Sequence, residues 1–317
     1  MPSINVIVSC TSRKTVTPET ECRMAQIRSV KTETRLADWI RRLSDSKGKA
    51  TRAMDLYCGD HWHVLRTLAE NQTEPPKFKL WVASAGWGLI SSEDKITSYG
   101  ATFSHLESDS VIHPRVALRE SRLWWNGLVQ SNLHGKNTPS SFTALAKRNP
   151  ESPMLVALPA GYLAAVRDDL LAARSLLEIP ELLVVVSGGT KREVELSRNL
   201  IPCDSRLQPL LGGSLTSLNA RTARFILENY NSRTLRANRV FQDFENLILQ
   251  SEKRSLPKRN AMTDEEVSDF ISKQLSIAHS KQSHSSLLRA FRDLGKACEQ
   301  RRFRRIYNDA IQSRNQK

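Results

Sequence analysis

The sequence lacks several features that would place it in a familiar class. No stretch approaches the roughly 18 consecutive apolar residues of a membrane-spanning helix, so we expect no membrane partner. The five cysteines form no Cys-x-x-Cys pair, which argues against a zinc knuckle and against a disulfide framework. No Gly-x-Gly-x-x-Gly fingerprint is present, and the run Gly188-Gly189-Thr190-Lys191 lacks the spacing of a phosphate-binding loop. We therefore expect neither a metal nor a cofactor.

Two further observations concern location and metal binding. Residues Met1 to Val8 have neither a basic segment nor a long apolar segment of the kind found in signal peptides, and are typical of a first strand. Together with the unpaired cysteines, this predicts a protein of the reducing cytoplasm. His61 and His63 form a His-x-His pair in a predicted helix, where positions i and i+2 do not share a face, so they do not predict a metal site.

Acidic residues are fewer than basic residues in this chain. The chain has 33 Asp and Glu against 47 Lys and Arg, which gives a net charge of +14 and an isoelectric point near 9.8. A surplus of this size draws a protein toward polyanions. We therefore expect nucleic acid as the partner. There are two alternatives: a basic surface that only keeps the protein in solution, and a basic surface that binds an anionic membrane.

Strand and helix patterns alternate through residues 1–230. Short β-branched runs predict buried strands at Ile4–Ser9, Phe78–Ala85, Met154–Leu158 and Glu181–Ser187. Helical spacing predicts helices at Arg28–Leu43, Ala53–Glu70 and Arg115–Leu128, from about Tyr162 to Leu177, and at Ser217–Asn229, with a surface loop in Gly135–Pro153. This alternation predicts an α/β catalytic-type domain, with a mainly parallel sheet and flanking helices.

The character of the chain changes at about Asn231. Residues 231–317 contain 18 Lys and Arg against 10 Asp and Glu, and strand patterns give way to helical ones. Thr263 and Glu266 form a capping box that predicts a helix ending near Ile277. A second helical pattern begins near Leu287. Residues 231–317 are therefore predicted to be a basic helical region that binds nucleic acid.

Four arginines lie within just over one turn of the last predicted helix. They are expected to contact phosphates, which gives affinity but little sequence information. A basic face that only improves solubility is the alternative interpretation. The four residues are Arg301, Arg302, Arg304 and Arg305.

The loop after the first strand is the first candidate for chemistry. Cys10 directly follows this strand, and Arg13 and Lys14 follow Cys10. Nearby positive charge favours the nucleophilic thiolate over the thiol. A small, inert residue buried at the end of a strand is the alternative interpretation of Cys10. Ser12, in the same loop, is a candidate for binding the substrate.

A Gly-Trp-Gly motif follows the second strand. Gly86 and Gly88 on either side of Trp87 would let the backbone approach a flat ligand while the ring stacks on it, as with a base taken out of the helix. Trp87 in the core, beside a tight turn, is the alternative. Asp94 is a candidate acid or base. The substrate-binding set predicted at these loops also includes Ser84, Tyr99 and Tyr162.

These loops all follow predicted strands. In parallel sheets, ligands bind outside the carboxyl ends of the strands. We therefore expect four loops to converge on one edge of the sheet. They are residues 9–14, 84–90, 159–162 and 187–190.

The order of these motifs resembles a family of bacterial proteins related to the YaaA peroxide-stress proteins. Leu158–Tyr162 and Gly212–Leu218 fit the family pattern loosely, and the resemblance covers roughly residues 1–230. Each motif is short, and their order is the more specific signal. The motifs are Ser-Cys-x-x-x-Lys from Ser9 to Lys14, the pair Leu56-Tyr57, and Ser-Ala-x-x-Gly-Leu-Ile from Ser84 to Ile90, followed by Tyr99.

Such a domain followed by a basic helical tail resembles the DpdC family of the bacterial deazaguanine DNA-modification system. The resemblance implies hydration of the nitrile of a cyano-deazaguanine base in DNA to the amide. It also implies DNA carrying a deazaguanine base as the substrate, and other proteins of the same modification system as partners. Trp87 stands where relatives often have a smaller-ringed aromatic, which bears on the shape of the pocket.

The residues allow this chemistry. A thiolate adds to a nitrile carbon to give a thioimidate, which water opens to the amide. Cys10 would supply the sulfur, while Lys14, Asp94 or Tyr99 would move protons, and the sequence does not assign which. Two alternatives remain: a DNA-binding protein without catalysis, and a base-modifying enzyme or glycosylase that uses Glu93 or Asp94.

Overall fold

The chain folds into two compact units, Met1–Lys253 and Arg254–Lys317. The computed structural model describes residues 2–72, 77–105, 107–117, 119–131, 133, 138–188, 194–251, 259–277 and 283–315. The boundary lies later than the predicted one at residue 230. Helix α9 (Ala237–Leu249) packs against two strands of the sheet and so belongs to the first unit.

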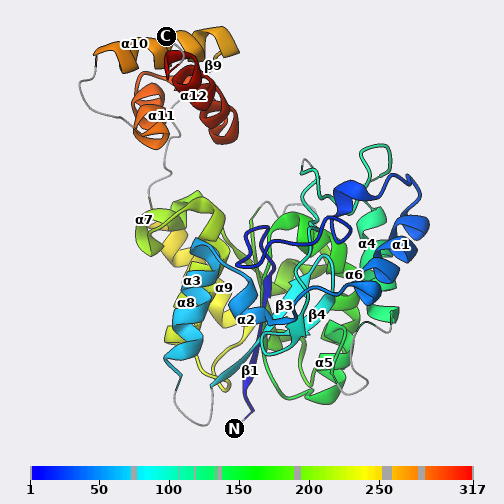
Figure 1. The fold of residues 1–317 in the computed structure, drawn as a ribbon. Helices are drawn as coiled ribbons and strands as arrows, with labels where there is room; N and C mark the ends of the chain where they lie inside the picture. The colour runs from blue at the N-terminus through cyan, green and yellow to red at the C-terminus, as the bar shows by residue number, and fades with distance from the viewer. Residues whose placement is uncertain are drawn as a thin grey trace. The chain divides into compact units, whose positions relative to one another are not determined.

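The first unit is built on a six-stranded sheet with the order β4-β3-β1-β6-β7-β8 (Figure 1). All neighbouring pairs are parallel except β3 and β4, so the predicted α/β fold with a mainly parallel sheet is confirmed. The strands are β1 (Ile4–Ser9), β3 (Phe78–Ser84), β4 (Gly88–Ser91), β6 (Met154–Ala157), β7 (Leu183–Ser187) and β8 (Leu200–Pro202).

The central strands are apolar because helices cover both faces of the sheet. Every residue of β1, β6 and β7 is buried. The one polar side chain inside β1, Asn5, is satisfied by the indole of Trp81, which donates to Asn5 Oδ1 at 3.0 Å. This pairing explains how an amide is tolerated in the core.

Helices α3, α8 and α9 cover one face of the sheet, and α1, α4, α5 and α6 cover the other (Figure 1). Short elements complete this unit: the antiparallel pair β2 (Thr51–Arg52) and β5 (Lys95–Ile96), and the helices α2 (Ala53–Leu56) and α7 (Gln208–Leu211). The covering helices not yet given are α1 (Thr32–Asp45), α3 (Asp60–Glu70), α4 (Glu120–Gln130), α5 (Phe142–Arg148), α6 (Ala160–Leu176) and α8 (Leu218–Asn229).

Three predictions of local structure are corrected. The helix predicted over Ala53–Glu70 is two helices, because Gly59 has a φ of +101° that a right-handed helix does not allow. The predicted loop Gly135–Pro153 contains α5, which begins where the Ser141 hydroxyl accepts the N–H of Ala144. Strand β4, which begins at Gly88, is absent from the predicted strands.

The second unit has its own core, built by α10 (Asp264–Ile277), α11 (His284–Asp293) and α12 (Gln300–Asn315). Strand β9 (Asn260–Ala261) pairs in parallel with β10 (Lys296–Ala297). The core residues are Val267, Ile271, Leu287, Leu288, Phe291, Cys298, Phe303 and Ile306.

The predicted capping box at the start of α10 is confirmed. The Glu266 N–H donates to Thr263 Oγ1, and the Thr263 N–H donates to the Glu266 carboxylate at 2.8 Å. Leu294, predicted to face the core, is exposed instead. It follows the end of α11, and Gly295, with a φ of +74°, turns the chain there.

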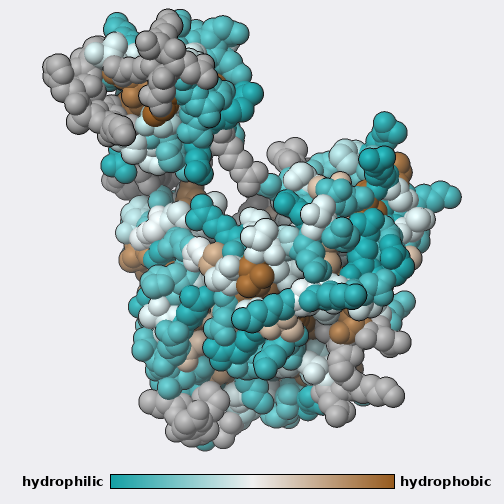
Figure 2. Space-filling model, in the orientation of Figure 1, coloured by the Kyte–Doolittle hydropathy of each residue, from teal (hydrophilic) through white to brown (hydrophobic). Residues whose placement is uncertain are grey.

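No helix within the described residues is both long enough and apolar enough to cross a membrane. On the face of the first unit shown in Figure 2, hydrophilic residues dominate and apolar ones form only small separate spots. The apolar side chains of this unit lie mainly in the core between sheet and helices.

Candidate active site

Cys10 lies at the point where the sheet changes direction. From β1 the chain moves to β3 on one side, whereas from β6, on the other side of β1, it moves on to β7. Crevices of this kind, outside the carboxyl ends of the strands, are the usual ligand sites of parallel sheets. Cys10 follows β1, Tyr162 follows β6, and the Cys10 Sγ lies 3.2 Å from the Tyr162 Oη.

A second set of hydroxyl groups follows β3. The Tyr99 Oη lies 2.6 Å from the Ser84 Oγ and 2.8 Å from the Tyr57 Oη, and all three residues are buried. Tyr162 is thus the phenol with a hydrogen-bonding contact to the Cys10 sulfur, and Tyr99 joins Ser84 to Tyr57.

Lys14 brings a buried amine to the same place. Its Nζ lies 4.2 Å from the centre of the Tyr99 ring and donates to the Thr11 carbonyl at 3.0 Å. Burial lowers the pKa of Lys14 from 10.5, while the charges of Cys10 and Asp109 oppose this effect. The neutral amine, which can accept a proton, is therefore more accessible than in an ordinary lysine.

The three phenols are donors, not acids. Burial raises the pKa of Tyr57, Tyr99 and Tyr162 well above the ordinary 10, and the negative charge of a Cys10 thiolate raises it further. They therefore keep their protons at neutral pH and can donate hydrogen bonds to an anionic sulfur or to a nitrogen bound to it.

His61 is a candidate base that the sequence interpretation missed. It lies in the first turn of α3, and its pKa is influenced by the backbone of Ser9, the last residue of β1. Burial lowers the pKa of His61 to about 4, although Asp60 and Ser9 act in the opposite direction. Its Nε2 is buried and has no hydrogen-bond partner within the described residues. The ring is therefore neutral at pH 7.

Gly86 is required by the packing of Tyr99. A Cβ at Gly86 would lie 2.5 Å from Tyr99 Cδ2 and 3.0 Å from Trp39 Cζ2. The flat ring that approaches this glycine is therefore the protein's own tyrosine, not a ligand. Tyr99 is fully buried, and its predicted part in substrate binding stays a prediction.

Trp87 packs against the core with part of its ring exposed, and its Nε1 is buried without a partner within the described residues. This favours its interpretation as a core residue beside a turn. Gly88 has a φ of +75°, which allows the tight turn into β4. Ser12 is exposed.

The two carboxylates considered as acid or base are held by local structure. Asp94 Oδ2 accepts the N–H of Ser91 at 2.8 Å, and Asp94 lines a cavity of about 140 Å³ with Trp87. Glu93 pairs with Arg52 at 3.2 Å. Asp94 thus forms part of a turn, and its catalytic role stays a prediction.

The arginines predicted to contact phosphates differ in their surroundings. Arg302 Nε donates to Asp264 Oδ1 at 2.5 Å, and Arg305 Nη2 donates to Asp264 Oδ2 at 2.8 Å. Arg304 is exposed, whereas the side chain of Arg301 lies outside the described residues, as do Gly189 and Thr190 of the fourth predicted loop. Asp264 thus competes with any phosphate for two of the four arginines.

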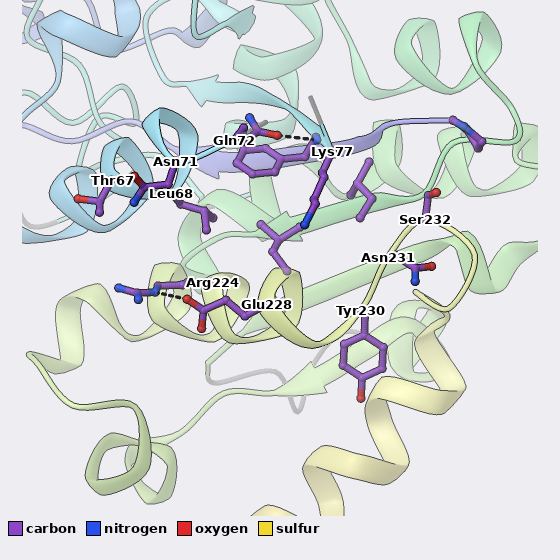
Figure 3. Close-up of a pocket in the computed structure, with 14 residues that line it drawn as sticks. Thr67, Leu68, Asn71, Gln72, Lys77, Arg224, Glu228, Tyr230, Asn231 and Ser232 are labelled. Carbon is purple, nitrogen blue, oxygen red and sulfur yellow. Dashed lines mark hydrogen bonds and ion pairs between the residues drawn. The ribbon is translucent and has the colours of Figure 1, made fainter. Parts of the chain in front are cut away.

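A large cavity lies at the opposite end of the sheet (Figure 3). Its volume is about 660 Å³, and it opens beside the amino ends of β1 and β3. Figure 3 shows Arg224 paired with Glu228 on α8, at 2.7 Å, and Lys77 at the start of β3. Its lining contains no cysteine or histidine, so we place the chemistry at Cys10 despite the size of this cavity.

Of the predicted residues, the structure brings together Cys10, Lys14, Ser84, Tyr99 and Tyr162. It adds three that were not predicted as site residues: Tyr57, His61 and Thr102, whose hydroxyl lies 3.4 Å from the Tyr162 Oη. Of these three residues, only Tyr57 belongs to a motif that carries the family resemblance, the Leu56-Tyr57 pair.

No protein-family model, no curated protein and no solved structure matches this chain.

Proposed function

We propose that this chain hydrates the nitrile of a cyano-deazaguanine base in DNA to the amide, through a thioimidate on Cys10. The observation that carries the proposal is the Cys10 sulfur at the switch point of the sheet, 3.2 Å from the Tyr162 hydroxyl. A nucleophile, a phenol at hydrogen-bonding distance from it and a buried amine form the set that addition to a nitrile requires.

The chemistry balances with these groups. The thiolate of Cys10 forms a bond to the nitrile carbon, one carbon–nitrogen π bond breaks, and the nitrogen takes a proton from the Lys14 ammonium while a phenol donates a hydrogen bond. Lys14, now the neutral amine, takes a proton from the water that adds to the thioimidate carbon and passes it to the nitrogen. The carbon–sulfur bond then breaks as the proton of the new hydroxyl returns to Lys14, which releases the amide and restores the thiolate and the ammonium. The net change is the addition of one water.

The burial of Cys10 favours a slender electrophile. Its side chain is only 5 % exposed, so a base inside a duplex is out of reach and must leave the stack. A nitrile is linear and two atoms long, and therefore reaches a recessed sulfur more readily than a branched carbonyl group does. The net charge of +14 supports DNA as the polymer that carries the base.

The test is to incubate the protein with DNA containing cyano-deazaguanine and to analyse the nucleosides by mass spectrometry. We expect the modified nucleoside to gain the mass of one water. Release of the free base would instead identify a glycosylase. Unchanged DNA that nevertheless binds the protein would identify a binding protein without catalysis. Either of these two results overturns the proposal.

A further inference from the structure

The hydroxyl of Tyr162 lies between two partners. Its Oη is 3.2 Å from the Cys10 Sγ and 3.4 Å from the Thr102 Oγ1. The Thr102 Oγ1 also accepts the N–H of Ser104 at 3.1 Å. One series of hydrogen-bonding contacts therefore leads from the backbone of Ser104, through two hydroxyl groups, to the sulfur of Cys10.

The number of protons limits how this series can be arranged. A threonine hydroxyl and a phenol each donate one hydrogen bond. When the Cys10 thiol loses its proton, the anionic sulfur becomes a stronger acceptor than the neutral hydroxyl of Thr102. Tyr162 then donates to the sulfur, and its oxygen accepts the proton of Thr102. Because neighbouring hydrogen bonds polarise one another, the second bond strengthens the first.

The backbone of Thr102 is held on both sides. Its N–H donates to the carbonyl of Asp109 at 3.0 Å, and its carbonyl accepts the N–H of Val111 at 2.9 Å. The Asp109 carboxylate in turn accepts hydrogen bonds from the Arg23 side chain and from the Ala25 N–H. The backbone that carries the Thr102 hydroxyl is therefore anchored independently of the phenol.

The next residue along the chain holds the ring of Tyr162. The Phe103 ring meets the Tyr162 ring edge-on, with the ring centroids 5.1 Å apart and an interplanar angle of 87°. A Cβ at Gly161 would lie 3.3 Å from the Phe103 carbonyl oxygen, so the start of α6 approaches this segment closely. Two consecutive residues, Thr102 and Phe103, thus contact the hydroxyl and the ring of the same tyrosine.

We propose that Thr102 is a positioning residue, which acts through the Tyr162 hydroxyl on the sulfur of Cys10. It directs the phenolic proton of Tyr162 toward the thiolate. The inference rests on the proposed function only in taking Cys10 as the nucleophile. It gives a part in the chemistry to the segment between β5 and α4.

The test is a pH titration of the ultraviolet absorbance of the Cys10 thiolate, taken as the difference between each protein and the same protein with Cys10→Ala. Thr102→Val removes the hydroxyl and keeps a side chain of similar shape. Its titration midpoint should rise by about half a pH unit, so that about threefold less thiolate is present at a pH below the midpoint. Thr102→Ser keeps the hydroxyl and should match the wild type.

Thr222→Val is the matched control, because the Thr222 hydroxyl lies 3.4 Å from the sulfur of Cys203 instead. It should leave the titration midpoint of Cys10 unchanged. An unshifted midpoint in Thr102→Val overturns the inference. A shift in Thr102→Ser or in Thr222→Val as large as that in Thr102→Val overturns it as well.

A second variant shows whether Thr102 acts through Tyr162. Tyr162→Phe should raise the midpoint by about one to two pH units, since the thiolate loses a hydrogen bond to a charged group. Adding Thr102→Val to Tyr162→Phe should change nothing further. A wild-type midpoint in folded Tyr162→Phe contradicts the inference, even if Thr102→Val does not fold. So does an equal effect of Thr102→Val with and without the Tyr162 hydroxyl.

The titration requires no nitrile, so the two proposals fail separately. A shifted midpoint in Thr102→Val without turnover of the modified DNA removes the substrate assignment and supports the role of Thr102. Full turnover by the wild type with an unshifted midpoint in Thr102→Val overturns the role of Thr102 and leaves the proposed function in place.

Discussion

The Cys10 sulfur and the Tyr162 hydroxyl lie 3.2 Å apart although 152 positions separate the two residues in the chain. Both follow parallel strands that are hydrogen-bonded neighbours, since β1 pairs with β6 from Asn5↔Met154 to Val8↔Ala157. The rigid sheet, not a long loop, therefore sets the distance between the sulfur and its donor. Such a distance is preserved when a single hydroxyl is removed, which makes the pair suitable for testing.

Removing the hydroxyl of Tyr162 should impair the chemistry more than the fold. Tyr162→Phe takes a proton donor from the sulfur, so we expect kcat/KM for nitrile hydration to fall about 100-fold. The free energy of unfolding should fall by only about 1 kcal/mol, the usual contribution of one hydrogen bond. Steady-state kinetics and urea unfolding measure the two effects.

Tyr230→Phe is the matched control, because the Tyr230 hydroxyl donates to Asp243 of α9 and not to Cys10. It should keep the activity of the wild type. Equal losses of activity in the two variants would show that the Tyr162 hydroxyl has no special relation to the chemistry.

The buried amine of Lys14 predicts a pH dependence of stability. Burial lowers the pKa of Lys14 below 10.5, so between its folded pKa and 10.5 the unfolded chain binds more protons than the folded chain. Stability therefore rises with pH in this window. Lys14→Met abolishes this contribution.

We expect the Lys14 form to gain stability relative to Lys14→Met as the pH rises toward 10.5, by at most about 1.4 kcal/mol per pH unit. Both proteins should also contain Cys10→Ala, which removes a neighbouring group that acts on the pKa of Lys14. Urea unfolding at several pH values measures the difference. Two parallel curves would mean that the amine is solvated and not buried.

Adding one methyl group at Gly86 should disturb the hydrogen bonds of the Tyr99 hydroxyl. The new Cβ of Gly86→Ala would lie 2.5 Å from the Tyr99 ring, so the ring must move away from Ser84 and Tyr57. Overpacking of this kind typically costs about 1–3 kcal/mol of unfolding free energy. At Gly48 a Cβ would meet only the Ser46 hydroxyl at 3.3 Å and the flexible Glu19 side chain, so Gly48→Ala is the control and should change stability by less than about 0.5 kcal/mol. Similar melting curves for the two variants would contradict the packing argument.

The sequence predicted the sheet better than its surroundings. Strand β1 was predicted residue for residue, because six consecutive buried positions, four of them apolar and β-branched, are a strong signal for a central parallel strand. The pattern of β-branched residues did not predict β4, because this strand begins with a glycine. It pairs antiparallel with β3 after a tight turn. The prediction also failed for α5, whose short amphipathic stretch lies among residues typical of loops.

The sequence also predicted part of the candidate site, from residues that follow strands. Cys10, Ser84 and Tyr162 follow strands, so the rule that strand ends converge was sufficient to group them. His61 and Thr102 reach the same place from a helix and a loop, and only tertiary structure brings them there. The role of Asp94 stays a prediction, because a carboxylate in a turn and a catalytic carboxylate have the same local sequence context.

The second unit should contribute phosphate contacts through α12. Replacing Arg304 and Arg305 with Ala should weaken binding to all DNA sequences alike, and flatten the slope of log affinity against log salt by up to about 1.8 units. Arg41→Ala with Arg224→Ala, two exposed arginines of the first unit, is the control. If the control pair flattens the slope equally, the DNA-binding surface does not lie on α12.

A substitution at Asp264 should act in the opposite direction. Its carboxylate holds Arg302 and Arg305, and the hydrogen bond from Arg302 lowers the pKa of Asp264. Asp264→Asn would release both guanidinium groups, so affinity for DNA should rise and the salt slope should steepen. Salt titrations of the variant and the wild type measure this, and coinciding slopes would show that these arginines do not contact phosphates.

The most direct test of the account compares two cysteines in the same position relative to a strand. Cys10 follows β1 and Cys203 follows β8, and each is 5 % exposed. Burial raises the pKa of Cys203 to about 11, and its thiol contacts Thr222 instead of a phenol. The measurement is turnover of cyano-deazaguanine DNA by Cys10→Ala and Cys203→Ala, with melting curves to confirm that both fold. The account predicts wild-type turnover in Cys203→Ala and none in Cys10→Ala, whereas continued turnover in folded Cys10→Ala would contradict it.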